Sequence, residues 1–301
     1  MRSRASGGRL VSYRSALRPQ LLGGQVVIVT GAGSGIGRCT AHEVAALGAM
    51  PVLVGRRLEK LERVRDELAQ DGLTSSLRVI DIRDAPAVNE GVASILAEHG
   101  RIDGLVNNAG GQFPSPLRDI SDKGWDAVVR NNLNGGFTMM REVYRQWMEA
   151  HGGAIVNVVA IVDFGMPSMG HTGAARAGMI NLTQTAALEW VHRGVRVNAV
   201  APGSIASSGM ATYNAEFQQR LKARQRQIPY QRMGTEAEIS ASICFLLSEA
   251  AAYITGVVLP VDGGLRLAKH LHTVPEHQSM PAFDPFGKTA LPDFLKTPEG
   301  N

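Results

Sequence analysis

The chain of 301 residues is 44% hydrophobic and 19% charged, which is enough apolar material for one large α/β domain and excludes disordered, collagen-like and coiled-coil chains. Basic residues outnumber acidic ones by 31 to 27, and the net charge of +4 and pI of about 9.3 favour an anionic ligand. The charge is spread diffusely along the chain and the aromatic content is only 5%, which argues against nucleic-acid binding. No apolar run approaches the ~20 residues that cross a bilayer, so no membrane partner is expected.

Two features bear on the compartment. The chain carries arginines and no acidic residue as far as His42, a composition that transit peptides share, but we interpret residues 1–20 as a flexible N-terminal arm or an over-long start. The two cysteines, Cys39 and Cys244, lie within apolar helical patterns and not in a paired framework. They are expected to be reduced core residues, which is typical of a cytoplasmic protein.

Short β-branched segments alternate with longer helical patterns between residues 25 and 259, as in βαβ units around a parallel sheet. Several of these segments are apolar without alternation, as expected when helices cover both faces of the sheet. We predict an α/β fold: a single doubly wound Rossmann-type domain over residues 21–270, with a seven-stranded parallel sheet flanked by helices, and a C-terminal tail over 271–301. The predicted strands are 26–30, 51–55, 77–81, 104–107, 154–159, 196–201 and 257–259.

Helix signals fall between these strands. Asp84 precedes a helix with Pro86 in its first turn, and Thr235 and Glu238 have the spacing of a capping box. Residues 58–70 place apolar side chains at helical spacing with charged residues between them. This pattern predicts an amphipathic helix that covers one face of the sheet.

The first predicted strand runs into a glycine-rich turn, Thr30-Gly31-Ala32-Gly33-Ser34-Gly35-Ile36-Gly37, and a helix follows. Glycine lets the backbone turn tightly and lets a pyrophosphate approach, while the free N–H groups of the helix N-terminus stabilise its negative charge. The strand before and the helix after are the context that this motif requires. We predict a dinucleotide cofactor in contact with Gly31, Ser34, Gly35 and Ile36.

The second predicted strand ends in Gly55-Arg56-Arg57. A base at this position accommodates a 2′-phosphate, whereas an acid would bind the free ribose hydroxyl. Arg56 and Arg57 therefore favour NADP(H), unless they are only the solvated start of the next helix. Asp81 and Ile82, after the third strand, are expected beside the adenine.

Later motifs identify a family. They are Asn107-Asn108-Ala109-Gly110, Pro202-Gly203-Ser204-Ile205 and Val261-Asp262-Gly263-Gly264. With the glycine-rich turn they resemble the short-chain dehydrogenase/reductase superfamily over about residues 21–265. The resemblance implies a homodimer or homotetramer, a role for Asn132 in positioning a water of a proton relay, and further cofactor contacts at Asn108, Ala109, Gly110, Pro202, Gly203 and Ile205.

The catalytic positions depart from the pattern of that family. Ala160 stands where a serine is expected, and Thr172 and Arg176 replace the tyrosine and lysine of Tyr-x-x-x-Lys. Carbonyl reduction by this route needs a phenol whose pKa is lowered by a neighbouring cation, and a threonine hydroxyl is too weak an acid. Arg176 can still hold the ribose of the nicotinamide and supply a fixed positive charge. Asn132, Thr172 and Arg176 remain the catalytic candidates.

One subgroup accommodates this departure. The segments Gly110-Gly111-Gln112-Phe113, Ser121–Trp125 and His171–Gly178 resemble peroxisomal trans-2-enoyl-CoA reductases and their bacterial relatives, which are similar to dienoyl-CoA reductases. Hydride delivered to Cβ of an enoyl thioester moves charge to the thioester oxygen, so an oxyanion site is needed and not an acid for an alkoxide. The tyrosine that those enzymes carry nearby is Ile180 here, and its role is not transferred.

The proton donor must then come from elsewhere. His171 is the first candidate because imidazole titrates near neutrality, although the more common role of such a histidine is a structural one, hydrogen-bonded in a loop. Asp163 and Gln112 are weaker candidates.

Two charged segments remain. Arg220, Lys222, Arg224 and Arg226 lie in the usual substrate-covering region and are read either as contacts for a coenzyme A nucleotide or as a solvated helix face. His270, His272 and His277 lack a carboxylate or thiolate at ligand spacing, so no metal site is expected.

These observations predict an NADPH-dependent reductase of a trans-2-enoyl-CoA or a similar activated alkene. One alternative is a dehydrogenase of isoprenoid or aliphatic alcohols and aldehydes, which a tyrosine entering the pocket, for instance Tyr213, would favour. The other is a non-catalytic NADP(H)-binding protein.

Overall fold

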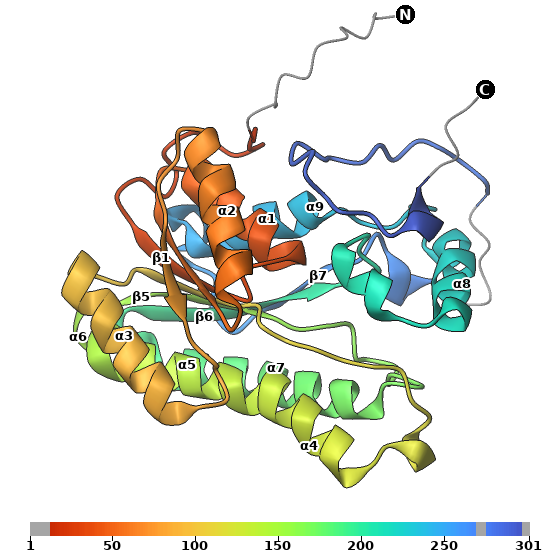
Figure 1. Ribbon diagram of the computed structural model, residues 1–301, viewed down its shortest axis with the longest axis horizontal. Helices are drawn as coiled ribbons and strands as arrows, with labels where there is room; N and C mark the ends of the chain where they lie inside the picture. Colours follow the sequence, from red (N-terminus) through yellow and green to blue (C-terminus); the bar gives the residue numbers. More distant parts are fainter. Residues whose placement is uncertain (1–12, 269–274, 297–301) are drawn as a thin grey trace, which may run out of the picture.

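The computed structural model describes residues 13–268 and 275–296, and its centre is one parallel sheet of seven strands in the order β3-β2-β1-β4-β5-β6-β7 (Figure 1). All the strand pairs are parallel, and the strand order reverses between β1 and β4. This reversal is the switch point at which doubly wound folds bind ligands. The strands are β1 (Val26–Thr30), β2 (Met50–Gly55), β3 (Ser76–Val79), β4 (Gly104–Asn107), β5 (Gly153–Val158), β6 (Val195–Pro202) and β7 (Val258–Val261).

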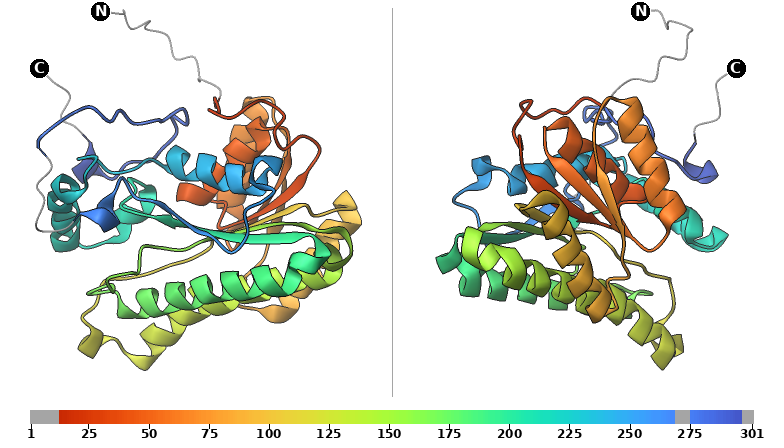
Figure 2. Two further views of the ribbon diagram at one scale, coloured as in Figure 1. Left: turned by 180° about the vertical axis from the view of Figure 1, so that it is seen from behind. Right: turned by 60° about the vertical axis from the view of Figure 1, so that its left-hand side comes forward.

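Helices cover both faces of the sheet (Figures 1 and 2). The layer on one face contains α1 (Gly35–Ala46), α2 (Leu58–Gln70) and α9 (Glu236–Leu247), and the opposite layer contains α3 (Ala85–His99), α4 (Asp122–Val129), α5 (Gly135–Val143) and α7 (Gly170–Trp190). Separate buried apolar clusters fill the two spaces between sheet and helices. The shorter helices are α6 (Glu149–His151) and α8 (Ala215–Arg224). The predicted fold class is confirmed.

Local sequence signals act as predicted. Asp84 accepts a hydrogen bond from the Ala87 N–H at 3.2 Å, and Thr235 and Glu238 form both bonds of the capping box. Helix α2 has the predicted bounds. The strands β3 and β7 are displaced from the predicted ranges by one or two residues, as is usual at element ends.

The chain segments on either side of the predicted domain pack against it where they are described. Tyr13 is buried with its ring centroid 5.8 Å from that of Phe286, and the Ser15 hydroxyl donates to Glu43 at 2.5 Å. Residues 13–20 are therefore not a detached arm, and residues 1–12 lie outside the described residues. The tail over 275–296 lies on the same side of the sheet as α1 and α9 (Figure 2).

Polar contacts fasten the tail to α1 and α2. The Lys288 ammonium donates to the Asp71 carboxylate at 2.7 Å. The backbone carbonyl of Lys288 accepts from the Arg38 guanidinium at 2.9 Å. His277 binds the Pro229 carbonyl through Nε2 at 2.8 Å, whereas His270 and His272 lie outside the described residues. The tail is therefore laid on the surface of its own domain.

Replacing Phe286 by alanine is expected to lower the free energy of unfolding by about 3–5 kcal/mol, the usual cost of removing a buried phenylalanine. The ring is 1% exposed and lies 5.1 Å from both the His42 ring and the Arg38 guanidinium. Urea unfolding should show this loss of stability. The control is Phe164→Ala, because the Phe164 side chain is 72% exposed. Equal midpoints for the two variants would contradict the packing described for the tail.

Cys39 and Cys244 are free and buried, as predicted. Burial raises the pKa of both thiols, so they are unreactive core residues at neutral pH. Within residues 13–268 and 275–296, none of the helices combines the length and apolar character that a membrane crossing requires.

Candidate active site

The glycine-rich turn lies at the switch point, between the carboxyl ends of β1 and β4. Gly31 has φ +68°, and a Cβ built on it would lie 2.9 Å from the Ala109 Cα, so glycine is required there for both conformation and space. Thr30 Oγ1 accepts from the N–H groups of Asn108 and Ala109 at 3.0 and 2.9 Å. The two loops that are expected to hold the cofactor are thus joined directly.

The N-terminus of α1 is open to an anion. Ser34 precedes the helix with extended backbone, but its side chain makes no capping hydrogen bond and the first turn contains no acidic residue. Gly35 has φ +57°, and outside its own helix and neighbours the one described atom within 4 Å of an added Cβ is Glu236 Oε1, at 3.8 Å. Free helix N–H groups beside open space fit a dinucleotide pyrophosphate.

Cations surround the position expected for a 2′-phosphate. Arg56 and Arg57 are exposed at the end of β2, and among the described residues neither of them forms an ion pair, whereas Arg63 and Arg65 of α2 do. Arg63 also donates to the Gly33 carbonyl at 3.3 Å, and burial together with Arg57 and Arg63 lowers the pKa of Lys60. This group of basic residues fits NADP(H).

The residues expected at the adenine have other partners. Arg83 binds the Asp81 carboxylate through Nε and Nη2 and lowers its pKa. Ile82 is buried, and a Cβ on Gly135 would lie 2.6 Å from its Cδ1. Asp81 and Ile82 follow the carboxyl end of β3, and their contact with adenine stays a prediction.

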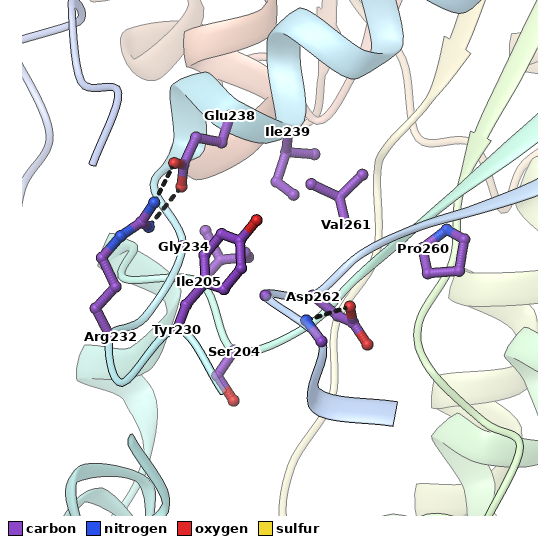
Figure 3. A pocket seen from close by; sticks show the side chains of 12 residues that line it. Ser204, Ile205, Tyr230, Arg232, Gly234, Glu238, Ile239, Pro260, Val261 and Asp262 are labelled. Atoms are coloured by element: carbon purple, nitrogen blue, oxygen red, sulfur yellow. Dashed lines mark hydrogen bonds and ion pairs between the residues drawn. The ribbon is translucent and has the colours of Figure 1, made fainter. Parts of the chain in front are cut away.

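A cavity of about 310 Å³ lies beside the motif expected at the nicotinamide (Figure 3). Gly203 donates to the Val261 carbonyl at 3.0 Å, which holds the loop after β6 against the end of β7. The Arg232 guanidinium binds Glu238 on the rim, with Nη2 2.6 Å from the carboxylate. Ser204 and Ile205 of this motif therefore border space in which a ligand group can lie, whereas the contacts expected at Pro202 and Gly203 stay predictions.

Asn132 lies in a π-helical stretch, Arg130–Asn134, that joins α4 to α5. Its amide donates to the carbonyls of Gly111 at 2.6 Å and Val128 at 2.9 Å and accepts from the Gly111 N–H at 3.3 Å. Such irregular turns are frequent at functional sites. Asn132 thus fixes the loop that follows β4.

Arg176 meets Asn132 at Gly110. A Cβ on Gly110 would lie 2.6 Å from both Arg176 Nη2 and Asn132 Oδ1. Arg176 Nη1 donates to the Val158 carbonyl at 2.6 Å, and no ion pair in the described part of the chain involves this residue. Burial lowers the pKa of Arg176 to about 10, so it stays cationic at neutral pH. The site therefore contains a fixed positive charge that no carboxylate neutralises.

The other predicted catalytic side chains are enclosed. His171 and Thr172 have no exposed surface, and His171 Nδ1 accepts from the Thr172 N–H at 2.9 Å. The His171 ring packs edge-on against Phe113 at 4.5 Å, and neither His171 Nε2 nor Thr172 Oγ1 has a partner among the described residues. Asp163 is exposed. Burial argues against His171 as the proton donor, because it cannot reach a substrate unless the first turn of α7 moves.

Two features escaped the sequence reasoning. The Gln112 amide donates a hydrogen bond to the Tyr213 hydroxyl at 2.5 Å, a contact over 101 residues that neither local sequence indicates. Glu236 is 2% exposed, lies against the glycine-rich turn and accepts from the Thr289 hydroxyl at 3.4 Å. The capping-box spacing points to Glu238, and no local signal marks Glu236.

Glu236 should make the stability of the protein depend on pH. Burial raises its pKa from 4.5 to about 7, so the neutral carboxyl stabilises the fold fully below about pH 4.5 and this contribution is lost as the pH rises through about 7. Glu236→Gln is expected to abolish the loss, worth about 3 kcal/mol, between pH 5 and 8. Melting temperatures measured across that pH range test this dependence. The control is Glu249→Gln, because Glu249 is also the first residue of a helical turn but is exposed. Parallel pH profiles of wild type and Glu236→Gln would contradict it.

A Rossmann-type sheet with a glycine-rich turn at its switch point defines a dinucleotide-binding protein. The chain belongs to the short-chain dehydrogenase/reductase family: the family model described as Enoyl-(Acyl carrier protein) reductase matches residues 31–266.

Three known proteins illustrate the similarity. A peroxisomal 2,4-dienoyl-CoA reductase from Rattus norvegicus is 35% identical over 257 residues, which are 85% of this chain and 88% of that protein. A citronellol catabolism dehydrogenase from Pseudomonas aeruginosa PAO1 is 54% identical in sequence, and its structure matches with a TM-score of 0.76. The match covers 84% of this chain and 99% of that protein's chain. A structure from Beutenbergia cavernae with bound NADP is 35% identical and covers 83% of this chain and 100% of its own, with a TM-score of 0.77.

Proposed function

We propose that the protein is an NADPH-dependent reductase of a carbon–carbon double bond conjugated to a thioester, as in a trans-2-enoyl-CoA. The observation that carries this proposal is the isolated Arg176 cation beside Asn132 and Gly110, at a site without the tyrosine and lysine of carbonyl reduction. The likeness to 2,4-dienoyl-CoA reductases supports the same chemistry.

The bound cofactor would supply a hydride. The glycine-rich turn would hold its pyrophosphate, Arg56 and Arg57 its 2′-phosphate, and the loop from Asn108 to Gly110 its ribose. Arg176 would stabilise the negative charge that develops when hydride reaches Cβ, because a cation in a partly desolvated site acts strongly on nearby charge. A bound NADP in a similar structure supports the choice of cofactor.

The substrate-covering region over residues 207–227, here called the lid, and the exposed faces of α5 and α7 add two further parts to the proposal. Lys222, Arg224 and Arg226 are exposed and would bind the nucleotide of coenzyme A, while Arg220 is paired with Glu216 at 2.7 Å. Exposed Phe137 on α5 and Leu188 on α7 support a homodimer or homotetramer packed through these helices.

The experiment is NADPH oxidation followed by fluorescence with a panel of enoyl-CoAs, dienoyl-CoAs, aldehydes and ketones. The proposal predicts turnover with crotonyl-CoA or octenoyl-CoA. Oxidation with free aldehydes alone would refute it, and cofactor binding without turnover on any compound would select a non-catalytic protein.

A second candidate is a dehydrogenase of an isoprenoid alcohol or aldehyde. It is favoured by the 54% identity to the citronellol catabolism dehydrogenase. That reaction requires a group that exchanges a proton with the alcohol oxygen, and Tyr213, whose hydroxyl is bound to Gln112 on the loop after β4, favours this candidate as well. Reduction of NADP⁺ by citronellol without any enoyl-CoA activity would establish it.

A further inference from the structure

Tyr213 and Gln112 form a bridge between the segment before α8 and the loop that follows β4. Tyr213 lies between the turn Ser208–Thr212 and helix α8, and its hydroxyl accepts from Gln112 Nε2 at 2.5 Å. Tyr213 is half-buried, and Phe217 packs against its ring with centroids 4.9 Å apart. Residues 101 apart in sequence are thus brought together, one from the lid and one from the loop after β4.

The neighbours of Gln112 place this bridge beside the catalytic residues. Gly111 exchanges hydrogen bonds with Asn132 through both its N–H and its carbonyl. Phe113, on the other side, packs on His171. Tyr213 is therefore joined, through Gln112, to the loop whose Gly110 and Gly111 contact Arg176 and Asn132.

In this bridge the Tyr213 hydroxyl is left as a hydrogen-bond donor. Because the Tyr213 oxygen accepts from Gln112, its own O–H proton is free for another partner. Burial raises the pKa of Tyr213, and the hydrogen bond from Gln112 opposes this only in part. The phenol therefore stays protonated at neutral pH, as a hydrogen-bond donor and not as a base.

Resting on the proposed function, we propose that Tyr213 is a catalytic residue whose hydroxyl donates a hydrogen bond to the thioester oxygen of the substrate, with Gln112 as its positioning residue. As the new C–H bond forms at Cβ, the π electrons of the double bond form a Cα=C bond and the thioester oxygen becomes an enolate oxygen. Tyr213 stabilises this oxygen without losing its proton. The Cα=C electron pair then takes a proton from water, the C=O bond re-forms, and hydroxide is left for the buffer to neutralise.

The assignment explains how the site works without a tyrosine at position 172. The enclosed Thr172 hydroxyl is replaced by a donor that arrives from the lid, so the oxyanion site is complete only when the lid contacts the loop after β4. Hydrogen-bond donors of this kind typically contribute ~10²–10³ in rate.

The test compares Tyr213→Phe with Tyr253→Phe, which makes the same change at a fully exposed position. With octenoyl-CoA, Tyr213→Phe is expected to lower kcat about 100-fold, with little change in KM, in the melting temperature or in the affinity for saturated octanoyl-CoA. Tyr253→Phe should match the wild type. If Tyr213 had only a structural role, its replacement would also change the melting temperature or the affinity for octanoyl-CoA. A reduced kcat with both of these unchanged therefore indicates a role in the reaction.

Gln112→Ala gives a second arm. It should reduce kcat by less than Tyr213→Phe, and the double variant should be no slower than Tyr213→Phe alone, because Gln112 acts through Tyr213. If the wild type reduces octenoyl-CoA and the kcat of Tyr213→Phe lies within twofold of the wild-type kcat, this assignment is wrong and the proposed function still stands. Failure of the wild type to reduce any enoyl thioester would overturn both.

Discussion

Arg176→Met is expected to lower kcat for an enoyl thioester by about 10²–10³-fold, the usual effect of removing one preorganised charge-stabilising group. Methionine preserves much of the length of the side chain but removes the cation that lies between Gly110 and the Val158 carbonyl. Steady-state kinetics with saturating NADPH measure the effect. Retention of more than a tenth of wild-type kcat would show that this charge is not used in the reaction.

Arg176→Lys separates charge from hydrogen-bond geometry. Burial depresses the pKa of a lysine ammonium, so the activity of this variant should fall as the pH rises through that lowered pKa. The pKa of Arg176 is about 10, so the wild type should keep its charge and its kcat up to about pH 9. The two pH profiles of kcat should diverge on the alkaline side. If they coincide, the state of charge at position 176 is irrelevant to the reaction.

Replacing both Arg56 and Arg57 by alanine is expected to raise the KM for NADPH by about 10–100-fold, since charge-assisted hydrogen bonds contribute ~1.5–3 kcal/mol each. The KM for NADH should change little, because NADH lacks the 2′-phosphate. Both residues are exposed at the end of β2, so the fold should be unaffected. Kinetics with the two cofactors measure the preference.

Arg65→Ala is the matched control, because Arg65 is an exposed arginine of α2 whose partners are Asp66 and Glu62. It should leave both KM values unchanged. An equal rise in the KM for NADPH and NADH in the double variant would mean that the arginines act on the whole cofactor and not on its 2′-phosphate.

The fold was predictable because its signals are local. Helix α2 has its predicted bounds because its apolar side chains recur at helical spacing, and Thr235 and Glu238 cap α9 through a contact over three residues. The packing of Tyr13 on Phe286 joins the two ends of the described chain, and no local pattern encodes it.

The site was predictable only in part, for the same reason. Gly31 is recognisable because its conformation and close approach demand glycine. The enclosure of His171 depends on Phe113 from another loop, and the partner of Tyr213 is 101 residues away. Burial and long-range contacts decide which polar side chain can act, and they follow from the tertiary structure alone.

The most direct test is to incubate the purified protein with NADPH and trans-2-octenoyl-CoA and to identify the product by mass spectrometry. We expect NADPH consumption to equal the formation of octanoyl-CoA, a gain of two hydrogens across the double bond with the thioester intact. Consumption of NADPH with citronellal but not with octenoyl-CoA would contradict the account, because the reaction would then be reduction of a carbonyl group at a site whose family tyrosine is Thr172.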